Sequence, residues 1–202
     1  MEQKGVTVWF TGMSGAGKTA LAIRLEEELR KRGLRVERLD GDIVRQGLTR
    51  DLGFSKEDRD MNIERVTFVA KLLTRNGVAV LASFISPYRV ARATAREEIG
   101  NFVEVFCYAP LETLVERDVK GLYKKALAGE IENFTGVSDP YEAPENAEVT
   151  IDSSTETIDQ SLAKILAKLE ELGYAPPPED DPAYTEDEEA EIEARLAALG
   201  YL

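Results

Sequence analysis

Near its amino end the chain reads Gly12-Met13-Ser14-Gly15-Ala16-Gly17-Lys18-Thr19, which matches the pattern G-x-x-x-x-G-K-[ST] in full. The β-rich run at residues 6–11 predicts a strand before it, and residues 18–32 predict a helix after it, with leucines along one stripe. Glycines let such a loop curl so that backbone N–H groups point inward, and the helix start adds a positive end. We therefore expect the loop to bind nucleoside triphosphate, and a chance glycine turn fits this context poorly.

The residue types in the loop suit a triphosphate that carries a metal ion. Lys18 should reach the β- and γ-phosphates, and the Thr19 hydroxyl should ligate Mg²⁺. A nucleoside triphosphate with Mg²⁺ is therefore the expected ligand, and the family resemblance described below implies that it is ATP. The predicted ATP-binding residues of the loop are Gly12, Ser14, Gly15, Ala16, Gly17, Lys18, Thr19 and Ala20.

Segments typical of strands and of helices alternate along the rest of the chain. Further strands are predicted at residues 36–40, 78–84, 102–107 and 149–151. Further helices are predicted after a capping box of Ser55 with Asp58, after Pro87, at residues 111–117 and at residues 157–172. The alternation predicts an α/β domain of the P-loop NTPase fold, a five-stranded parallel sheet with helices on both faces.

Residues 118–146 interrupt this alternation. The segment is polar, contains Gly121, Gly129 and Gly136, and lacks a long apolar stripe. A stretch of this length without clear structure in a compact domain is often functional. We expect it to form a mobile lid.

Composition restricts the partners of the chain. Apolar residues make up 43% of its 202 residues, and the longest apolar runs have the length of strands, so no membrane segment is expected. A net charge of −13 disfavours non-specific binding of nucleic acid. The single Cys107 cannot form an internal disulfide, and no leader-like start is evident, so a cytoplasmic location is expected.

The composition changes after residue 174. We expect a body at residues 1–174, a proline-rich linker at 175–182 and an acidic helix at 183–202. From Ala175 onward the chain has nine acidic residues against Arg195, which is −8 of the total charge. The tail is either a solvated appendage or a helix that docks on a partner subunit or on the body itself.

Two carboxylates follow the second predicted strand, in Asp40-Gly41-Asp42. Small-molecule kinases with this loop place an acid there, beside the acceptor hydroxyl, where it can accept a proton and help hold the metal. The alternative is that both aspartates only cap a turn. No Asn-Lys-x-Asp of the kind that reads guanine in GTPases occurs.

Several longer strings resemble the adenylylsulfate kinase (APS kinase) family. They are Leu39-Asp40-Gly41-Asp42-Ile43-Val44-Arg45-Gln46-Gly47-Leu48, Leu52-Gly53-Phe54-Ser55 with Asp58-Arg59 and Asn62, Phe84-Ile85-Ser86-Pro87-Tyr88-Arg89, Lys120-Gly121-Leu122-Tyr123-Lys124-Lys125, and Asn133-Phe134-Thr135-Gly136 before Asp139-Pro140-Tyr141-Glu142. The likeness runs from about Gly5 to Tyr174. It implies phosphorylation of the 3′-hydroxyl of adenosine 5′-phosphosulfate by ATP, as in sulfate assimilation. It also implies a homodimer and a possible association with an ATP sulfurylase.

The resemblance also implies roles for individual residues. Asp42 corresponds to the acid beside the 3′-hydroxyl and, with Thr19, to a metal ligand. Arg45 and Arg59 correspond to grips on the phosphosulfate, an oxyanion that planar guanidinium groups suit. Phe54 and Phe134 correspond to an aromatic sandwich on the adenine of the acceptor. The implied substrate-binding residues are Asp42, Arg45, Phe54, Arg59, Asn62, Ile85, Ser86, Lys120, Asn133 and Phe134.

The implied catalytic residues are Asp42, Lys18, Ser86 and Lys120, and Arg117 and Ser154 are expected near the adenine of ATP. The serine that matches Ser86 has been described in the family as a phosphoserine intermediate. Direct in-line transfer needs no covalent stage, so we expect only a hydrogen bond from Ser86.

The chain departs from the family pattern at Cys107-Tyr108, at Glu132 and in its acidic tail. Two other functions stay open from the residues alone. One is a kinase for another hydroxyl compound, such as shikimate or gluconate. The other is a nucleotide sensor or scaffold without catalysis.

Overall fold

The computed structural model describes residues 3–178. Its centre is one sheet of five parallel strands in the order β2-β3-β1-β4-β5. These strands are β1 (Val6–Thr11), β2 (Val36–Asp40), β3 (Ala79–Ser83), β4 (Phe102–Tyr108) and β5 (Val149–Asp152). The predicted fold class is confirmed, because each predicted strand is present and all pair in parallel.

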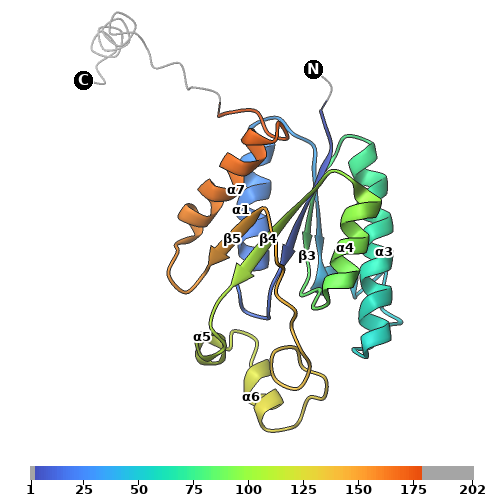
Figure 1. Cartoon of the computed structure of the whole chain (residues 1–202), viewed down its shortest axis with the longest axis vertical. Helices are drawn as coiled ribbons and strands as arrows, with labels where there is room; N and C mark the ends of the chain where they lie inside the picture. The colour runs from blue at the N-terminus through green and yellow to red at the C-terminus, as the bar shows by residue number, and fades with distance from the viewer. Residues whose placement is uncertain (1–2, 179–202) are drawn as a thin grey trace, which may run out of the picture.

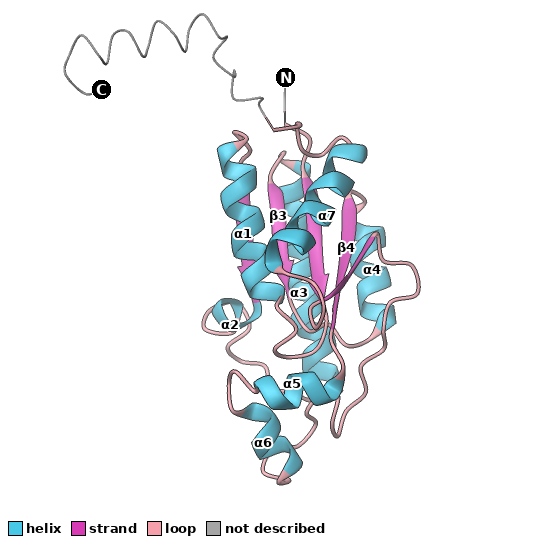
Figure 2. Ribbon diagram, turned by 90° about the vertical axis from the view of Figure 1, so that its left-hand side faces the viewer, coloured by secondary structure: helices cyan, strands magenta, loops and turns pink. Residues whose placement is uncertain are grey.

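Two pairs of helices cover the two faces of the sheet (Figure 1). Helices α1 (Lys18–Lys31) and α7 (Ile158–Glu171) lie on one face, and α3 (Lys56–Arg75) and α4 (Arg89–Ile99) lie on the other. Figure 2 shows the same layers from the side. The Ser55 side chain caps α3 by accepting a hydrogen bond from the Asp58 backbone at 3.1 Å, in agreement with the predicted capping position.

The core divides between the two faces because side chains alternate along a strand. Val8 and Phe10 of β1 belong to the apolar cluster under α1 and α7, whereas Trp9 belongs to the cluster under α3 and α4. Every residue of β1 and β3 is buried. This burial explains why the two strands read as apolar runs rather than as alternating patterns.

The remaining helices are short and lie at the carboxyl ends of the strands. Helix α5 (Leu111–Arg117) matches its prediction, whereas α2 (Gly41–Val44) and α6 (Leu122–Leu127) were not predicted. Four residues are too few to show a helical period, and in α6 only Tyr123 and Ala126 are buried. The predicted lid therefore contains a short helix, and it projects below the sheet with α5 (Figure 1).

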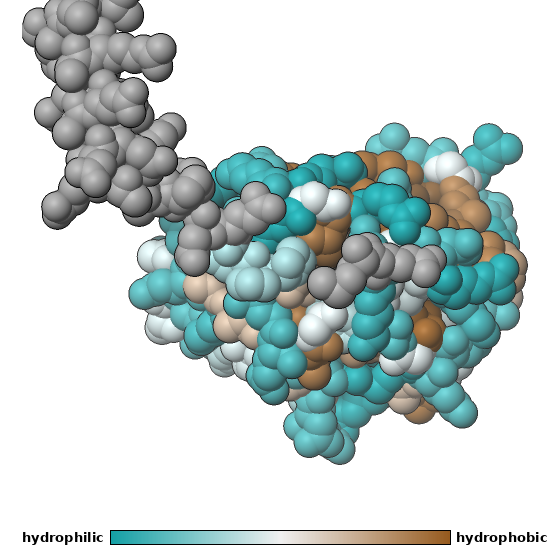
Figure 3. All heavy atoms as spheres, turned by 90° about the horizontal axis from the view of Figure 1, so that it is seen from above, coloured by the Kyte–Doolittle hydropathy of each residue, from teal (hydrophilic) through white to brown (hydrophobic). Residues whose placement is uncertain are grey.

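Both ends of the described chain lie on the side away from the lid (Figure 1). Seen from that side, the surface is mostly hydrophilic with scattered apolar patches (Figure 3). The acidic helix predicted at 183–202 and the second half of the linker predicted at 175–182 fall outside the described residues. Within residues 3–178, no helix has the length and apolar character that crossing a membrane requires.

Candidate active site

The glycine-rich loop is held against strand β4 at a position where only glycine fits. Gly12 has a φ of 145°, and a Cβ at this position would lie 2.1 Å from the Cys107 carbonyl oxygen. Helix α1 then begins after Gly17, which has a φ of 91° and offers no side-chain cap. The first backbone N–H groups of α1 therefore remain available to an anion, as the sequence predicted.

Lys18 lies beneath this loop. Its ammonium group donates hydrogen bonds to the carbonyl oxygens of Gly12 and Met13, each at 2.8 Å. Burial of the ammonium group lowers the pKa of Lys18 to about 8, although nearby Cys107 and the aspartates act in the opposite direction. The second lysine of the site, Lys120, lowers it further. Two cations thus face one cavity, and an anionic ligand would relieve their repulsion.

Asp40 joins the loop to the end of strand β2. One oxygen of its buried carboxylate accepts a hydrogen bond from the Thr19 hydroxyl at 2.8 Å, and the other accepts from the Asp42 backbone at 3.0 Å. Asp40 therefore caps α2, which is the alternative that the sequence left open, and it also contacts the predicted metal ligand Thr19. The sequence prediction of the site omitted Asp40, although its place at the end of β2 was a usable signal.

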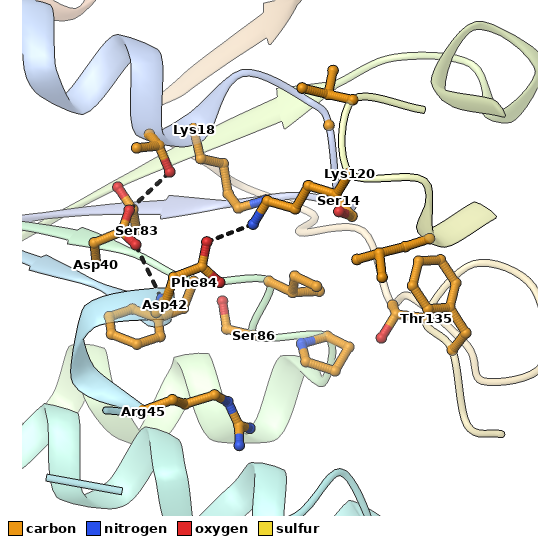
Figure 4. A pocket seen from close by; sticks show the side chains of 18 of the residues that line it. Ser14, Lys18, Asp40, Asp42, Arg45, Ser83, Phe84, Ser86, Lys120 and Thr135 are labelled. Carbon is orange, nitrogen blue, oxygen red and sulfur yellow. Dashed lines mark hydrogen bonds and ion pairs between the residues drawn. The ribbon is translucent and has the colours of Figure 1, made fainter. Parts of the chain in front are cut away.

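Asp42 instead contacts the predicted lid. Its carboxylate forms an ion pair with Lys120 at 2.5 Å, and both side chains are exposed (Figure 4). This pair brings the predicted base and the predicted lid lysine together across 78 residues of sequence. The hard oxygen donors beside Lys18 are the Thr19 hydroxyl and the Asp40 carboxylate, and such donors suit Mg²⁺.

On the side of α3, two arginines surround the loop that carries Phe54. The Arg45 guanidinium lies 4.3 Å from the centre of the Phe54 ring and donates to the Gly53 carbonyl at 3.0 Å. Desolvation lowers the pKa of Arg45, and the neighbouring charge of Arg59 adds to this effect. Arg59 donates to the Phe54 carbonyl at 2.9 Å. The predicted anion grips are therefore close together and close to the predicted adenine platform.

The predicted lid, residues 118–146, places Phe134 on the other side of the cavity. Its ring packs edge-on against Tyr123, with 5.1 Å between ring centres. The Tyr123 hydroxyl donates to the Ser14 carbonyl at 2.9 Å, and burial raises the pKa of Tyr123 to about 12. The lid is thereby bonded to the phosphate loop. Tyr123 was not among the predicted site residues, because no pattern in the polar segment distinguishes it.

The turn after β3 holds Ser86 in a strained conformation. Its φ is 41°, in the left-handed region that favours glycine. The buried hydroxyl accepts a hydrogen bond from the Trp9 indole at 3.0 Å and lies 3.1 Å from the Thr11 hydroxyl, to which it donates. The Ser86 carbonyl accepts from Arg92 at 2.6 Å. The hydroxyl is thus engaged by the protein rather than presented as a free nucleophile.

One cavity of about 480 Å³ collects these groups, a size that suits a small-molecule site. Of the predicted residues, it is lined by Ser14, Gly15, Gly17, Lys18, Thr19, Ala20, Asp42, Arg45, Phe54, Arg59, Asn62, Ile85, Ser86, Lys120 and Phe134. Residues that the prediction omitted also line it, among them Asp40, Ser83, Asp118, Tyr123 and Thr135. Asn62 is buried, and within residues 3–178 its carbonyl oxygen has no hydrogen-bond partner, so an acceptor in the cavity awaits a donor.

Five predicted residues do not line this cavity. Gly12 and Ala16 are buried within the loop, and Asn133 lies beside Phe134 with its carbonyl bonded to Arg59. Arg117 donates to the Ser153 carbonyl at 2.6 Å, and Ser154 donates to Asp152. A Cβ on Gly17 would lie 4.0 Å from the Ser153 side chain, so Arg117 and Ser154 lie near the phosphate loop although they do not line the cavity.

Comparisons with known proteins agree with this geometry. The family model described as adenylylsulphate kinase matches residues 4–152. An adenylyl-sulfate kinase of Halothermothrix orenii is 63% identical over 178 residues, which cover 88% of this chain and 96% of that protein.

Solved structures agree as well. An APS kinase of Mycobacterium tuberculosis in complex with AMPPNP and APS superposes with a TM-score of 0.80 at 44% identity, covering 83% of this chain and 99% of that one. A hexameric APS kinase from Thiobacillus denitrificans superposes with a TM-score of 0.66 at 39% identity, covering 87% of this chain and 30% of that one.

Proposed function

The chain belongs to the adenylylsulphate kinase family, and on that premise we propose that it transfers the γ-phosphoryl group of ATP to the 3′-hydroxyl of adenosine 5′-phosphosulfate. The products are ADP and 3′-phosphoadenosine 5′-phosphosulfate, and the step belongs to sulfate assimilation. One observation carries this proposal. A single cavity is lined by the phosphate loop with Lys18, by the carboxylate of Asp42, and by the two phenylalanines Phe54 and Phe134.

ATP would bind with its phosphates on the glycine-rich loop. Lys18 would exchange its bonds to the Gly12 and Met13 carbonyls for the β- and γ-phosphate oxygens. Arg117 and Ser154 lie near the phosphate loop but outside the cavity that holds the proposed acceptor site, which supports their assignment to the adenine of ATP. Thr19 and Asp40 would hold Mg²⁺, with Asp42 nearby, and the ion would neutralise charge on the transferred group.

The acceptor would lie between Phe54 and Phe134, with its ribose toward Asp42. In the reaction, the 3′-hydroxyl gives its proton to the Asp42 carboxylate while its oxygen bonds to the γ-phosphorus. The bond from that phosphorus to the bridging oxygen of ADP breaks. Lys120 must leave Asp42 for this to happen, and its charge would then stabilise the transferred phosphoryl group together with Lys18.

No covalent enzyme intermediate is part of this proposal. The Ser86 hydroxyl is buried against Trp9 and Thr11, so it would have to leave two hydrogen bonds to attack phosphorus. Its backbone, together with that of Ile85, would instead shape the floor of the acceptor site. Arg45 would bind the phosphosulfate, because its guanidinium lines the cavity beside Phe54.

The wider setting of the enzyme is also a proposal. We expect a catalytic body at residues 1–174 with the lid at 118–146, a cytoplasmic location, a homodimer and a possible association with an ATP sulfurylase. The hexameric relative supports self-association in the family.

An acceptor panel tests the function. Purified protein with MgATP should release ADP when adenosine 5′-phosphosulfate is added, and it should release little with shikimate, with gluconate or without acceptor. The product should carry its new phosphate on the 3′-oxygen, as phosphorus NMR would report. Turnover of shikimate or gluconate alone would refute the acceptor assignment, and ATP binding without any turnover would favour a nucleotide sensor.

A further inference from the structure

We propose that Arg59 is a positioning residue that joins the two phenylalanine-bearing segments of the acceptor site and thereby sets the gap in which the purine stacks. The inference rests on the proposed function, since it assumes that a nucleotide is the acceptor. It gives Arg59 a role toward the base in addition to any contact with the anion.

The hydrogen bonds of one guanidinium group carry the proposal. On one side, Arg59 Nε donates to the Phe54 carbonyl at 2.9 Å. On the other side, Nη1 donates to the Thr135 hydroxyl and Nη2 donates to the Asn133 carbonyl. The two lid partners are the neighbours of Phe134 on either side. A single planar group therefore bonds to the segments of both rings.

The contact to the lid is reinforced by Asp139. Its carboxylate lies 3.6 Å from Arg59 and also accepts a hydrogen bond from the Tyr88 hydroxyl at 3.1 Å. The side chains of Arg59 and Asp139 are only 11% and 17% exposed, so water screens the pair weakly. The Ser138 hydroxyl accepts from the Phe134 backbone at 2.9 Å, which orders the same short loop.

Neither ring is fixed in place by burial alone. Phe54 is 61% exposed, and Arg45 covers one of its faces, so its other face is the one available to a base. Phe134 is partly buried at the edge of the main core, against Tyr123. The separation of the two rings therefore depends on how the α3 segment and the lid are joined, and Arg59 bonds to both.

Most N–H donors of Arg59 already bond to protein acceptors, which favours a positioning role over a role in anion binding alone. A guanidinium group has five N–H donors, and three of them bond to protein acceptors here. Lysine at this position would keep the positive charge but would lose the fork that reaches both segments. Charge and positioning can therefore be separated by substitution.

The test uses two ligands that share the base but differ in charge. Adenosine has no anionic group, whereas adenosine 5′-phosphosulfate has one, and both are titrated by ligand-observed NMR into protein saturated with AMPPNP. We expect Arg59→Lys to weaken both ligands by a similar factor of about tenfold, within the range that base stacking contributes. Thr135→Val, which removes one acceptor, should weaken both in the same direction by a smaller factor.

Two kinetic readouts and a control accompany the titration. In Arg59→Lys, the KM for adenosine 5′-phosphosulfate should rise while the KM for ATP stays unchanged. Arg65→Lys is the matched control on the same helix, because Arg65 pairs with Asp51 at 2.7 Å outside the cavity, and it should bind adenosine like wild type. Thermal unfolding of each variant checks the fold, and if Arg59→Lys does not fold, Thr135→Val carries the test.

The outcomes separate the alternatives. A loss of adenosine 5′-phosphosulfate binding with unchanged adenosine binding would overturn the proposal and leave Arg59 as an anion grip. Unchanged binding of both ligands would overturn it as well, and so would a wild-type protein that does not bind adenosine. Adenosine binding by a wild-type protein that does not phosphorylate adenosine 5′-phosphosulfate would refute the proposed function without touching the role of Arg59.

Discussion

The affinity for ATP should fall as the pH rises, because of the protonation state of Lys18. Burial lowers the pKa of its ammonium group to about 8 in the free protein. A polyphosphate against the ammonium group favours the charged form and raises the pKa again. Above pH 8 the free protein has lost this proton while the complex retains it, so binding must take up a proton.

The size of the effect follows from that one value. If Lys18 stays protonated in the complex, the apparent affinity is proportional to the protonated fraction of the free protein. That fraction falls about tenfold between pH 7 and pH 9, which corresponds to about 1.4 kcal/mol of binding free energy. Proton uptake should rise from about 0.1 at pH 7 to about 0.9 at pH 9. Cys107, Tyr123 and Tyr141 do not interfere, because burial raises the pKa of each to about 12.

Isothermal titration calorimetry with MgAMPPNP measures both quantities. Titrations at pH 7.5, 8.5 and 9.5, each in two buffers of different ionisation enthalpy, give the affinity and the number of protons taken up. Lys18→Arg is the matched control, since arginine stays charged over this range and its affinity should not follow pH. An affinity that is flat from pH 7.5 to 9.5 in wild type, without proton uptake, would refute the reasoning.

Three further predictions concern other residues of the site. Asp42→Ala should lower kcat by about 10²- to 10⁴-fold, the range of general-base catalysis, and leave the Kd for ATP within a factor of three; near wild-type turnover in a stopped ADP assay would contradict its role. Ser86→Ala should keep kcat within about tenfold of the wild-type value, and intact-mass spectrometry of the wild-type enzyme should detect no phosphoenzyme. The same substitution leaves the Trp9 indole without its acceptor, so urea titrations should show a free energy of unfolding that is lower by about 1–3 kcal/mol. Cys107 is buried with a raised pKa, so the folded protein should react with a thiol reagent at pH 8 only as fast as it opens, and immediate labelling would contradict the packing against Gly12.

The fold could be predicted because its signals are local. A complete phosphate-loop pattern, five strand-like runs and the helices between them are each readable within a window of about 15 residues, and all five strands are present. The order of the strands was not predicted, because it depends on contacts between distant segments. Helix α2 was missed since its cap, Asp40, reads equally well as a turn residue.

The sequence predicted most of the residues that line the site, but not which of them bond to one another. Phe54 and Phe134 were expected on one ligand, and both line one cavity. The pairing of Lys120 with Asp42 could not be predicted from spacing, because it depends on how the segment 118–146 folds over the site. The bond from Thr19 to Asp40 could not be predicted either, because it joins the start of α1 to the end of β2. Similarly, Arg59 was expected to bind an anion, and only the folded lid reveals its bonds to the segments of both rings.

The ion pair between Lys120 and Asp42 has a consequence for hydrolysis of ATP in the absence of the acceptor. Water competes with the acceptor hydroxyl for the phosphoryl group. A kinase whose base is free to activate water would hydrolyse ATP. Here the proposed base, the Asp42 carboxylate, is already paired with the ammonium group of Lys120 in the predicted lid. If Asp42 is the base, as proposed, the ion pair would oppose hydrolysis of ATP by water until the acceptor is bound.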